Sequence, residues 1–309
     1  MHVLILGGNG FIGSHITDLL LKEGHRVSIF DRASEQFRPP LKDVRYIFGS
    51  FGDPFSMGEA LSGIDMVYHL VNTTLPGTSN LDPVADVQDN LVSTLRLLDL
   101  MEKAGVKRIL FLSSGGTVYG NPETVPIPET HPINPICSYG VVKAAIENYL
   151  YMYRHLHGLS TVVIRPSNAY GPRQGHLGIQ GVISTFLHRV LQGQPLAVWG
   201  DGSVVRDYIY VEDLARLCVT AGLSGRTGTY NAGSGTGHTI NDVISMTSRV
   251  TGTEPEVRYL EKRSFDIKEA VLDASRAMED FGWSATTDLM EGISKHWDWL
   301  KKYYGKPPL

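Results

Sequence analysis

The chain has 309 residues, 42% of them hydrophobic and 19% charged, which is enough to bury a large core in one big domain or two closely packed ones. Its net charge of −4 and its lack of basic runs argue against a nucleic-acid or anionic-membrane partner. Its two cysteines, Cys137 and Cys218, are too few for a disulfide framework, and its apolar runs are too short for a signal peptide or a membrane span, so we expect a cytoplasmic protein.

The first half of the chain alternates short apolar runs with amphipathic segments. Six β-rich runs predict strands buried on both faces of a parallel sheet: HVLILG, RVSIFD, VRYIFG, MVYHLV, RILFLS and STVVIRP. Residues 13–23, 89–104 and 139–156 show helical periodicity. Six successive βα units predict an α/β fold with a doubly wound parallel sheet of the Rossmann type.

Beyond residue 165, stretches rich in glycine and proline separate a few helical segments. This pattern is typical of a smaller α/β domain that lies over the strand ends and binds the substrate. We therefore predict a dinucleotide-binding domain over residues 1–166 and a substrate domain over residues 167–309, with some later segments returning to the first domain.

The segment LILGGNGFIGSHI carries three glycines at three-residue spacing between the first strand and the first helix. Such glycines let the backbone turn sharply and approach a pyrophosphate, which the N–H groups of the helix start then bind. A glycine-rich turn can also serve close packing alone, but its place after the first strand favours a dinucleotide. The predicted contacts are Gly7, Gly10, Phe11, Ile12 and Gly13.

The second strand run ends at Asp31, where a carboxylate accepts both ribose hydroxyls and repels a 2′-phosphate. This favours NAD over NADP. Arg32 leaves NADP open, since a guanidinium there tolerates the phosphate; it is otherwise a solvated charge or a cover for the adenine. Further strand ends are predicted to face the same crevice and bind cofactor: Ser50, Phe51, Leu70, Val71 and Asn90. Phe51 either flanks the adenine or belongs to the core.

Tyr139 and Lys143 in SYGVVKAAIENYL lie one helical turn apart. A lysine ammonium beside a phenol is expected to lower the phenol pKa, so that the tyrosine exchanges a proton with a sugar hydroxyl while the lysine holds the nicotinamide ribose. The same spacing also occurs on helix surfaces without a catalytic role.

Together with RPSNAYGPRQ, RDYIYVEDLA and RSFDIKEAVLDASRA, these motifs resemble the extended short-chain dehydrogenase/reductase family over essentially the whole chain, in its nucleotide-sugar epimerase/dehydratase branch. The similarity is greatest to enzymes like UDP-glucose 4-epimerase, including those of surface-polysaccharide gene sets. The resemblance implies that Tyr139 is the acid/base, that Lys143 tunes it, and that NAD is the cofactor, with Pro166 among its contacts. It also implies a homodimer formed through helices 89–104 and 139–156.

The resemblance also implies a nucleotide-diphosphate sugar as the partner, most naturally a UDP-sugar. Its substrate-binding residues are Asn168 near the diphosphate, Trp199 beside the base, Arg206 and Arg263 on the two phosphates, Asp266 and Ala270. The arginines could instead pair with Asp207 and Asp266, and Trp199 could belong to the core. Ala270 occupies the position that limits sugar size, which predicts that UDP-N-acetylglucosamine is accepted, unless this alanine is only filler.

The segment SSGGTVYG departs from both branches of the family. Dehydratases have Thr-Asp-Glu and typical 4-epimerases Ser-Ala-Thr where this chain has Gly115, Gly116 and Thr117. The missing carboxylates disfavour dehydration. We expect Thr117 to supply the second catalytic hydroxyl. The alternatives are Ser114, a water molecule, or Tyr139 acting alone, and Thr117 could instead bond the loop backbone.

The predicted reaction is oxidation at C4 by bound NAD, rotation of the 4-keto sugar and return of the hydride to its other face. Two alternatives stay open. One is an NAD(P)H-dependent reductase of a 4-keto-6-deoxy sugar, and the other is a non-catalytic dinucleotide-sensing protein of the same fold.

Overall fold

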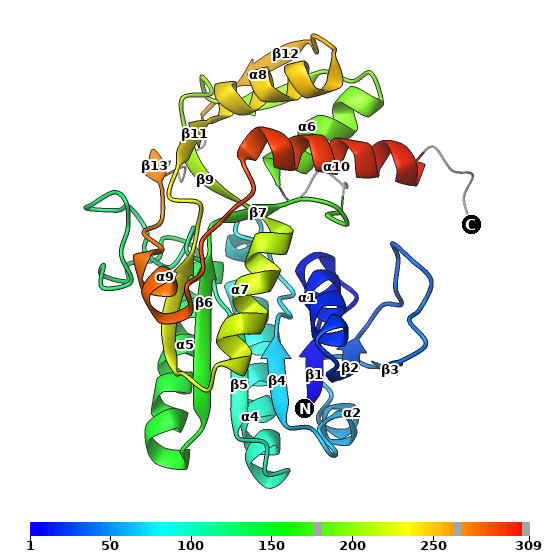
Figure 1. The fold of residues 1–309 in the computed structure, drawn as a ribbon. Coiled ribbons are helices and arrows are strands. Elements are labelled where there is room, and N and C mark those ends of the chain that lie inside the picture. The colour runs from blue at the N-terminus through cyan, green and yellow to red at the C-terminus, as the bar shows by residue number, and fades with distance from the viewer. Residues whose placement is uncertain (176–180, 263–266, 305–309) are drawn as a thin grey trace. The chain divides into compact units, whose positions relative to one another are not determined.

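The computed structural model describes residues 1–175, 181–262 and 267–304 (Figure 1). The chain forms two compact units. The first unit comprises Met1–Gly120, Pro132–Arg165 and Ala215–Tyr230, and the second comprises Asn121–His131, Pro166–Leu214 and Asn231–Leu309. Each unit therefore contains several separate segments of the chain, and residues 215–230 return to the first.

A seven-stranded sheet forms the centre of the first unit, in the order β10-β6-β5-β4-β1-β2-β3. Its strands are β1 (His2–Leu6), β2 (Arg26–Asp31), β3 (Val44–Phe48), β4 (Met66–His69), β5 (Arg108–Leu112), β6 (Ser160–Pro166) and β10 (Gly228–Ala232). The pairs from β6 to β3 are parallel. In the register, β1 lies between β2 and β4, so the strand order reverses there, and dinucleotides bind at such a point.

The six strands predicted from the sequence are all present, and the doubly wound Rossmann-type sheet is confirmed. Two details were wrong. No helix joins β2 to β3 in the described chain, because residues 32–43 follow an irregular path containing prolines. The seventh strand, β10, was missed, because its partner β6 lies far away in the sequence.

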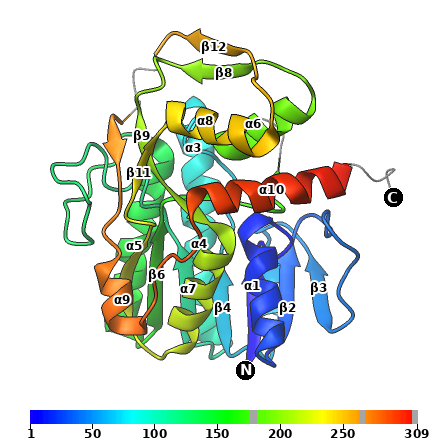
Figure 2. The same cartoon turned by 45° about the horizontal axis from the view of Figure 1, so that its top comes forward.

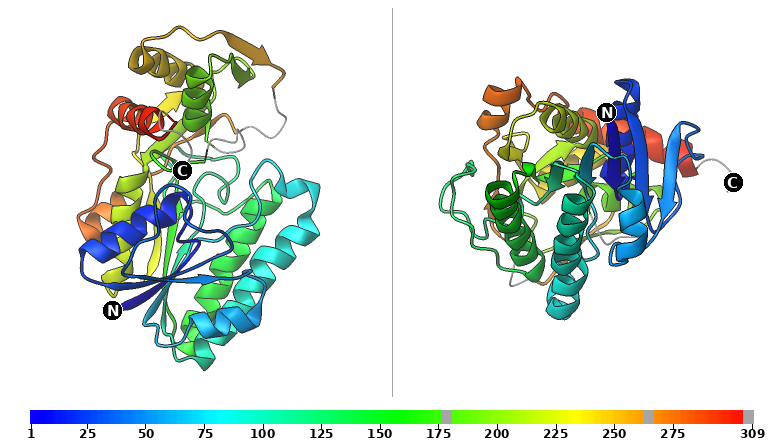
Figure 3. Two further views of the ribbon diagram at one scale, coloured as in Figure 1. Left: turned by 90° about the vertical axis from the view of Figure 1, so that its right-hand side faces the viewer. Right: turned by 90° about the horizontal axis from the view of Figure 1, so that it is seen from below.

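Helices cover both faces of this sheet: α1 and α7 lie on one, and α4 and α5 on the other (Figure 3). The helices are α1 (Phe11–Lys22), α2 (Pro54–Ala60), α3 (Pro83–Asp86), the π-helical η2 (Val87–Val92), α4 (Ser93–Lys103), α5 (Ser138–His157) and α7 (Val211–Leu223); a short 3₁₀ turn, η1 (Ser79–Leu81), precedes α3. The predicted helix over 89–104 thus begins as a π-helix. Helix α5 ends at Gly158, whose φ of 65° is the left-handed conformation that glycine adopts easily.

The second unit contains smaller sheets and four helices within its described segments. Strands β11 (Gly237–Thr239), β9 (Val205–Tyr210) and β13 (Glu269–Ala270) are joined by β7 (Asn168–Tyr170), while β12 (Val257–Leu260) pairs with β8 (Leu196–Trp199). Helices α6 (Val182–Leu191), α8 (Ile240–Thr251) and α10 (Leu289–Tyr304) pack together, as Figure 2 shows, and α9 (Ser275–Phe281) is short. No helix of the described segments is long and apolar enough to span a membrane.

Candidate active site

The turn between β1 and α1 is a cradle built mainly from glycines. Gly7 has a φ of +83°, and the Gly10 N–H donates to the Gly7 carbonyl oxygen at 3.1 Å. A Cβ on Gly13 would overlap that same oxygen, so only glycine lets α1 start this close to β1. Because Gly10 caps α1 without a side-chain hydrogen bond, the first N–H groups of the helix stay available to a phosphate.

Asp31 lies at the end of β2, beside this cradle. Its two carboxylate oxygens accept hydrogen bonds from the backbone N–H groups of Asn9 at 3.1 Å and Ala33 at 3.2 Å. The carboxylate is therefore fixed in orientation, and each oxygen keeps a lone pair for a ribose hydroxyl. Arg32 is exposed. The glycines and this carboxylate fit the pyrophosphate and adenosine ribose of NAD.

The other strand-end residues differ in what they expose. Ser50 is exposed, Leu70 is half-buried and Pro166 is buried at the end of β6. Phe51 and Val71 pack against the core, and the Phe51 ring lies 4.9 Å from the His69 ring, which fits the core alternative for Phe51. Asn90 is buried, and its side-chain oxygen accepts the Thr73 N–H at 2.9 Å.

Tyr139 and Lys143 lie one turn apart at the start of α5. The Lys143 ammonium nitrogen donates to the Leu112 carbonyl oxygen at 2.8 Å, and it lies 5.6 Å from the centre of the Tyr139 ring. Gly140, next to the tyrosine, permits close packing, because a Cβ there would lie 2.8 Å from the Thr117 carbonyl oxygen. The first turn of α5, which carries Tyr139, therefore packs closely against the loop that follows β5.

Burial dominates the electrostatics of this pair. It raises the pKa of Tyr139, and the hydrogen bond between the Ser114 and Tyr139 side chains acts in the opposite direction. Burial also lowers the pKa of Lys143 to about 7, against the charges of Glu147 and Asp86. The expected lowering of the tyrosine pKa was wrong for this state, because burial of the phenol dominates and raises its pKa.

The hydroxyl groups of the loop SSGGTVYG differ in their hydrogen-bond partners. Ser113 donates to a Glu147 carboxylate oxygen at 2.5 Å, and Ser114 bonds with Tyr139. The Thr117 hydroxyl is buried and has no hydrogen-bond partner among the described residues, so it does not bond the loop backbone there. A Cβ on Gly116 would meet nothing within 4 Å. The loop therefore has open space beside it and one unused hydroxyl.

A buried ion pair behind the catalytic residues was missed from the sequence. Arg165, at the end of β6, binds the Glu147 carboxylate through two of its nitrogens and donates to the Tyr119 hydroxyl at 2.9 Å. Glu147 stands four residues after Lys143, on the same stripe of α5 as Tyr139. That spacing was the available signal, but its partner Arg165 could not be paired with it without the fold.

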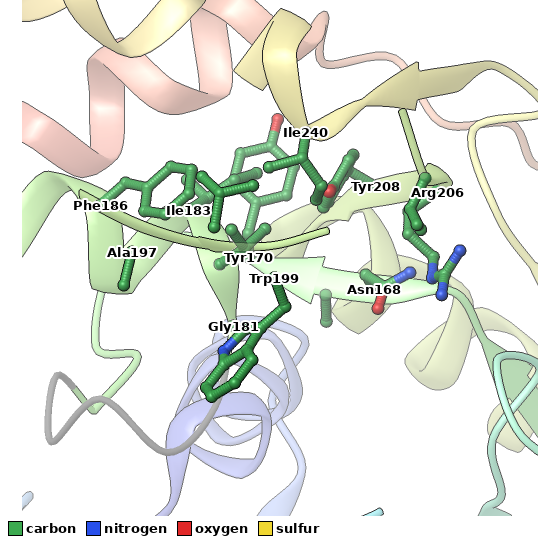
Figure 4. A pocket seen from close by; sticks show the side chains of 14 residues that line it. Asn168, Tyr170, Gly181, Ile183, Phe186, Ala197, Trp199, Arg206, Tyr208 and Ile240 are labelled. Carbon is green, nitrogen blue, oxygen red and sulfur yellow. The ribbon is translucent and has the colours of Figure 1, made fainter. Parts of the chain in front are cut away.

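The second unit has a pocket of about 250 Å³ (Figure 4). Asn168 and Arg206 lie at one end of it, and Phe186 and Ile183 at the other. Asn168 donates to the Asp207 carbonyl oxygen at 3.0 Å, and an Arg206 nitrogen donates to the Val205 carbonyl oxygen at 2.8 Å. The pocket thus combines an apolar end with an end that carries an amide and a cation.

Two aromatic residues of this pocket differ in exposure. Trp199 is 45% exposed, which does not fit the alternative of a core tryptophan. The Tyr208 hydroxyl is buried and has no hydrogen-bond partner in the described part of the chain, and no sequence pattern pointed to it. A buried unsatisfied hydroxyl is unfavourable, so a ligand that reaches it gains a hydrogen bond.

The remaining predicted substrate residues lie around β13. Ala270 is buried in that strand and stands in register with Arg206 on β9. The carboxylate of Asp207 is buried and accepts hydrogen bonds from Ser234 and from the Leu272 N–H. Arg263 and Asp266 lie outside the described residues.

Comparisons with known proteins agree on the family. The model of the NAD dependent epimerase/dehydratase family matches residues 3–233. This chain belongs to that family. A UDP-glucose 4-epimerase of Mycolicibacterium smegmatis is 34% identical over 96% of this chain and 97% of its own length.

Solved structures of epimerases share the whole fold. The UDP-glucose 4-epimerase of Thermotoga maritima, solved with UDP-glucose, is 34% identical, covers 98% of this chain and 99% of its own, and has a TM-score of 0.93. The enzyme of Thermus thermophilus, solved with NAD, is 35% identical, covers 97% of this chain and 99% of its own, and has a TM-score of 0.92. The glycine cradle and Asp31 thus lie in a member of an NAD-dependent family.

Proposed function

We propose that this protein is an NAD-dependent 4-epimerase of UDP-hexoses. The observation that carries the proposal is the pair of Tyr139 and Lys143, one helical turn apart at the start of α5, packed against a loop that lacks the carboxylates of dehydratases. This arrangement moves one proton to and from a hydroxyl, and it offers no acid and base for eliminating water. Relatives named UDP-glucose 4-epimerase support the same reaction.

NAD, when bound, supplies a hydride acceptor and donor at C4 of the sugar. The cradle of Gly7, Gly10 and Gly13 holds its pyrophosphate through backbone N–H groups, and Asp31 holds its adenosine ribose. Lys143 is assigned to the nicotinamide ribose. Lys143 itself is buried, which shields its ammonium from bulk water.

Tyr139 takes the proton of the C4 hydroxyl and later returns it. As a base it must reach the phenolate form, which a protonated Lys143 and a hydrogen bond from Ser114 both stabilise. The Lys143 pKa of about 7 means that a large fraction of this lysine carries its proton at neutral pH. Small changes in the surroundings of the lysine therefore alter the reactivity of the tyrosine.

The two hydroxyls of the loop are assigned separate tasks. Ser114 bonds with the phenol, and Thr117, whose hydroxyl is buried and unused in the described residues, bonds to the sugar. Ser114→Ala and Thr117→Val are expected each to lower kcat by about 10-fold to 100-fold, as for one positioned hydroxyl. If Thr117→Val kept full turnover, the second hydroxyl would belong to Ser114 alone.

The pocket of the second unit is assigned to the uridine diphosphate. Trp199 and Tyr208 would bind the base, and Asn168 and Arg206 the diphosphate, with Arg263 and Asp266 as further predicted contacts. The small Ala270 supports the acceptance of N-acetylated sugars. A solved relative of 29% identity and TM-score 0.91 is named UDP-N-acetylglucosamine 4-epimerase.

The assembly and the cellular setting are part of the same proposal. Helix α5 exposes apolar side chains, including Val141 at 51% and Leu156 at 70%, which supports pairing with a second copy in a homodimer. Both cysteines are free, which fits the reducing cytoplasm. The predicted product is a nucleotide sugar for surface polysaccharide.

A panel of nucleotide sugars tests the proposal. The protein is incubated with NAD and UDP-glucose, UDP-N-acetylglucosamine or dTDP-glucose, and the products are identified by proton NMR. The expected product from each UDP-sugar is a mixture of the two C4 epimers, with no net NADH. A 4-keto-6-deoxy sugar, or consumption of NADH in reducing an added keto sugar, would contradict it.

A further inference from the structure

The first turn of the catalytic helix α5 is capped by a distant segment. Its own N-cap residue, Cys137, makes no side-chain hydrogen bond to the helix. Instead, the Ser138 N–H donates to Asn80 at 2.8 Å, and the Tyr139 N–H donates to the Ser79 hydroxyl at 3.1 Å. These side chains satisfy N–H groups that the helix leaves open, so residues 79–80 fix the place of Tyr139.

Asp86 completes this contact. It is fully buried, and its carboxylate accepts the Ser138 hydroxyl at 2.7 Å, the Thr74 hydroxyl at 2.6 Å and the Asn90 amide at 2.9 Å. The Thr74 hydroxyl itself accepts from the Asn72 amide, so its proton is free to point at Asp86. Three donors converge on the carboxylate, which is the environment of an ionised group.

No lysine or arginine of the described residues lies within ion-pair distance of Asp86. A buried carboxylate without a cation is costly, even when hydrogen bonds offset part of its desolvation. An asparagine of the same shape could make similar contacts without a charge. Because an uncharged residue would avoid this cost, we infer that the charge of Asp86 acts on neighbouring groups.

These groups are the two catalytic side chains. The Tyr139 pKa is raised chiefly by burial, which Ser114 opposes, and further by Cys137 and then by the charge of Asp86. The Lys143 pKa is lowered chiefly by burial, and the charges of Glu147 and then of Asp86 oppose that effect.

Two further charged or titratable side chains near Lys143 are already engaged, whereas Cys137 is a free thiol. Glu147 on α5 forms its ion pair with Arg165 of β6. His69, at the end of β4, is buried and hydrogen-bonded to Thr94, and its pKa of about 3 keeps it neutral. Asp86 is therefore the anion in this set that holds no ion pair within the described residues.

We propose that Asp86 is a positioning residue for Tyr139 and Lys143, fixing the first turn of α5 through Ser138 and keeping a negative charge beside the pair. The inference rests on the proposed function, in which Lys143 must be protonated. A buried anion holds that proton on the lysine although the lysine is itself buried. Asp86 touches neither substrate nor cofactor, and it acts through the helix and through the electric field.

The test separates the charge from the hydrogen bond. Asp86→Asn and Asp86→Ser remove the charge, and Ser138→Ala removes only the hydrogen bond. The lysine pKa is measured by NMR titration of protein carrying ¹³Cε-labelled lysine, with the Lys143 signal identified by its absence in Lys143→Met. The pH dependence of kcat for UDP-galactose is measured on the same proteins.

Both Asp86 variants are expected to lower the Lys143 pKa and to move the pH optimum of kcat downward, by about 0.5 to 1 unit, since removing an anion lowers the pKa of the lysine and of the tyrosine alike. Ser138→Ala is expected to lower kcat about 2-fold to 5-fold without moving the profile. An unchanged lysine titration in a folded Asp86 variant, or an equal shift in Ser138→Ala, overturns the inference.

The NMR titration needs no substrate. If the wild-type protein does not interconvert UDP-sugars, the proposed function fails, while the lysine titration still decides whether Asp86 supplies the charge. Melting curves show which of the two Asp86 variants is folded, so that a loss of activity through unfolding is recognised.

Discussion

The glycine cradle with its catalytic pair and the pocket of the second unit are built in opposite ways. In the first, backbone geometry and hydrogen bonds fix each group before any ligand arrives, as they do for Asp31 and Lys143. In the second, Trp199 is 45% exposed and the Tyr208 hydroxyl has no partner within the described ranges. The difference indicates that changes in the first site damage catalysis or folding, whereas changes in the pocket reduce affinity.

The strongest test of this contrast is Tyr139→Phe. It removes the hydroxyl that accepts the proton of the C4 hydroxyl and returns it, so kcat should fall by about 10³-fold while NAD affinity changes little. Tyr153→Phe on the same helix is the control, since the Tyr153 hydroxyl donates to Asp99, away from the catalytic pair. Steady-state kinetics compare the two, and near-normal turnover in Tyr139→Phe would remove the tyrosine from the mechanism.

Gly13→Ala tests the claim that the cradle is set by the backbone. The added Cβ overlaps the Gly7 carbonyl oxygen and must push α1 away, which should destabilise the protein by about 1–3 kcal/mol and weaken NAD binding at least 10-fold. Gly77→Ala is the matched control, because a Cβ there meets nothing within 4 Å. Calorimetric titration with NAD and thermal melts measure both effects. Equal behaviour of Gly13→Ala and Gly77→Ala would contradict the claim that the glycine backbone sets the NAD site.

Arg206→Ala tests the pocket. Loss of one charge-assisted contact to a phosphate should raise KM for UDP-glucose about 10-fold to 100-fold, with kcat and the melting temperature nearly unchanged. Arg226→Ala, at an exposed position, is the control. A fall in kcat at constant KM would show that the pocket takes part in the chemistry, against the contrast drawn above.

His296→Leu gives the smallest effect and separates two kinds of unsatisfied group. His296 is buried in α10, and neither ring nitrogen has a hydrogen-bond partner among the described residues. Unlike Tyr208, it lines no pocket that the structure describes. Replacing it should stabilise the protein by about 1 kcal/mol at neutral pH, with activity unchanged.

The pH dependence of stability checks the same residue. Burial lowers the His296 pKa from 6.5 to about 3, so between these values the unfolded chain binds a proton that the folded chain does not. Stability therefore falls as the pH drops through this window, by up to about 1.4 kcal/mol per pH unit for each such histidine. Urea unfolding from pH 7 to pH 4 should give a shallower decline in His296→Leu, and parallel curves would contradict this assignment.

The sequence predicted the parts of the site that depend on local spacing. The glycine turn, Asp31 at a strand end and Tyr139 one turn from Lys143 follow from residues close in the chain, and their positions agree with the structure. The six buried strands were also predicted, because each is a short apolar run that can be recognised from its own residues alone.

Long-range pairing could not be predicted. The ion pair of Glu147 with Arg165, the β10–β6 pairing and the Ser138–Asp86 contact join segments whose meeting depends on the completed fold. Burial likewise reversed the expected effect on the Tyr139 pKa, because the sequence does not show how deeply the phenol lies. These are the features on which the electrostatics of the site depends.

The most direct test of the central claim, a hydride that leaves C4 and returns to it, uses UDP-galactose labelled with deuterium at C4. In the presence of NAD and without any other redox reagent, the UDP-glucose formed should keep the deuterium at C4, and no NADH should accumulate. Loss of the label to solvent, or a product unchanged at C4, would contradict the account.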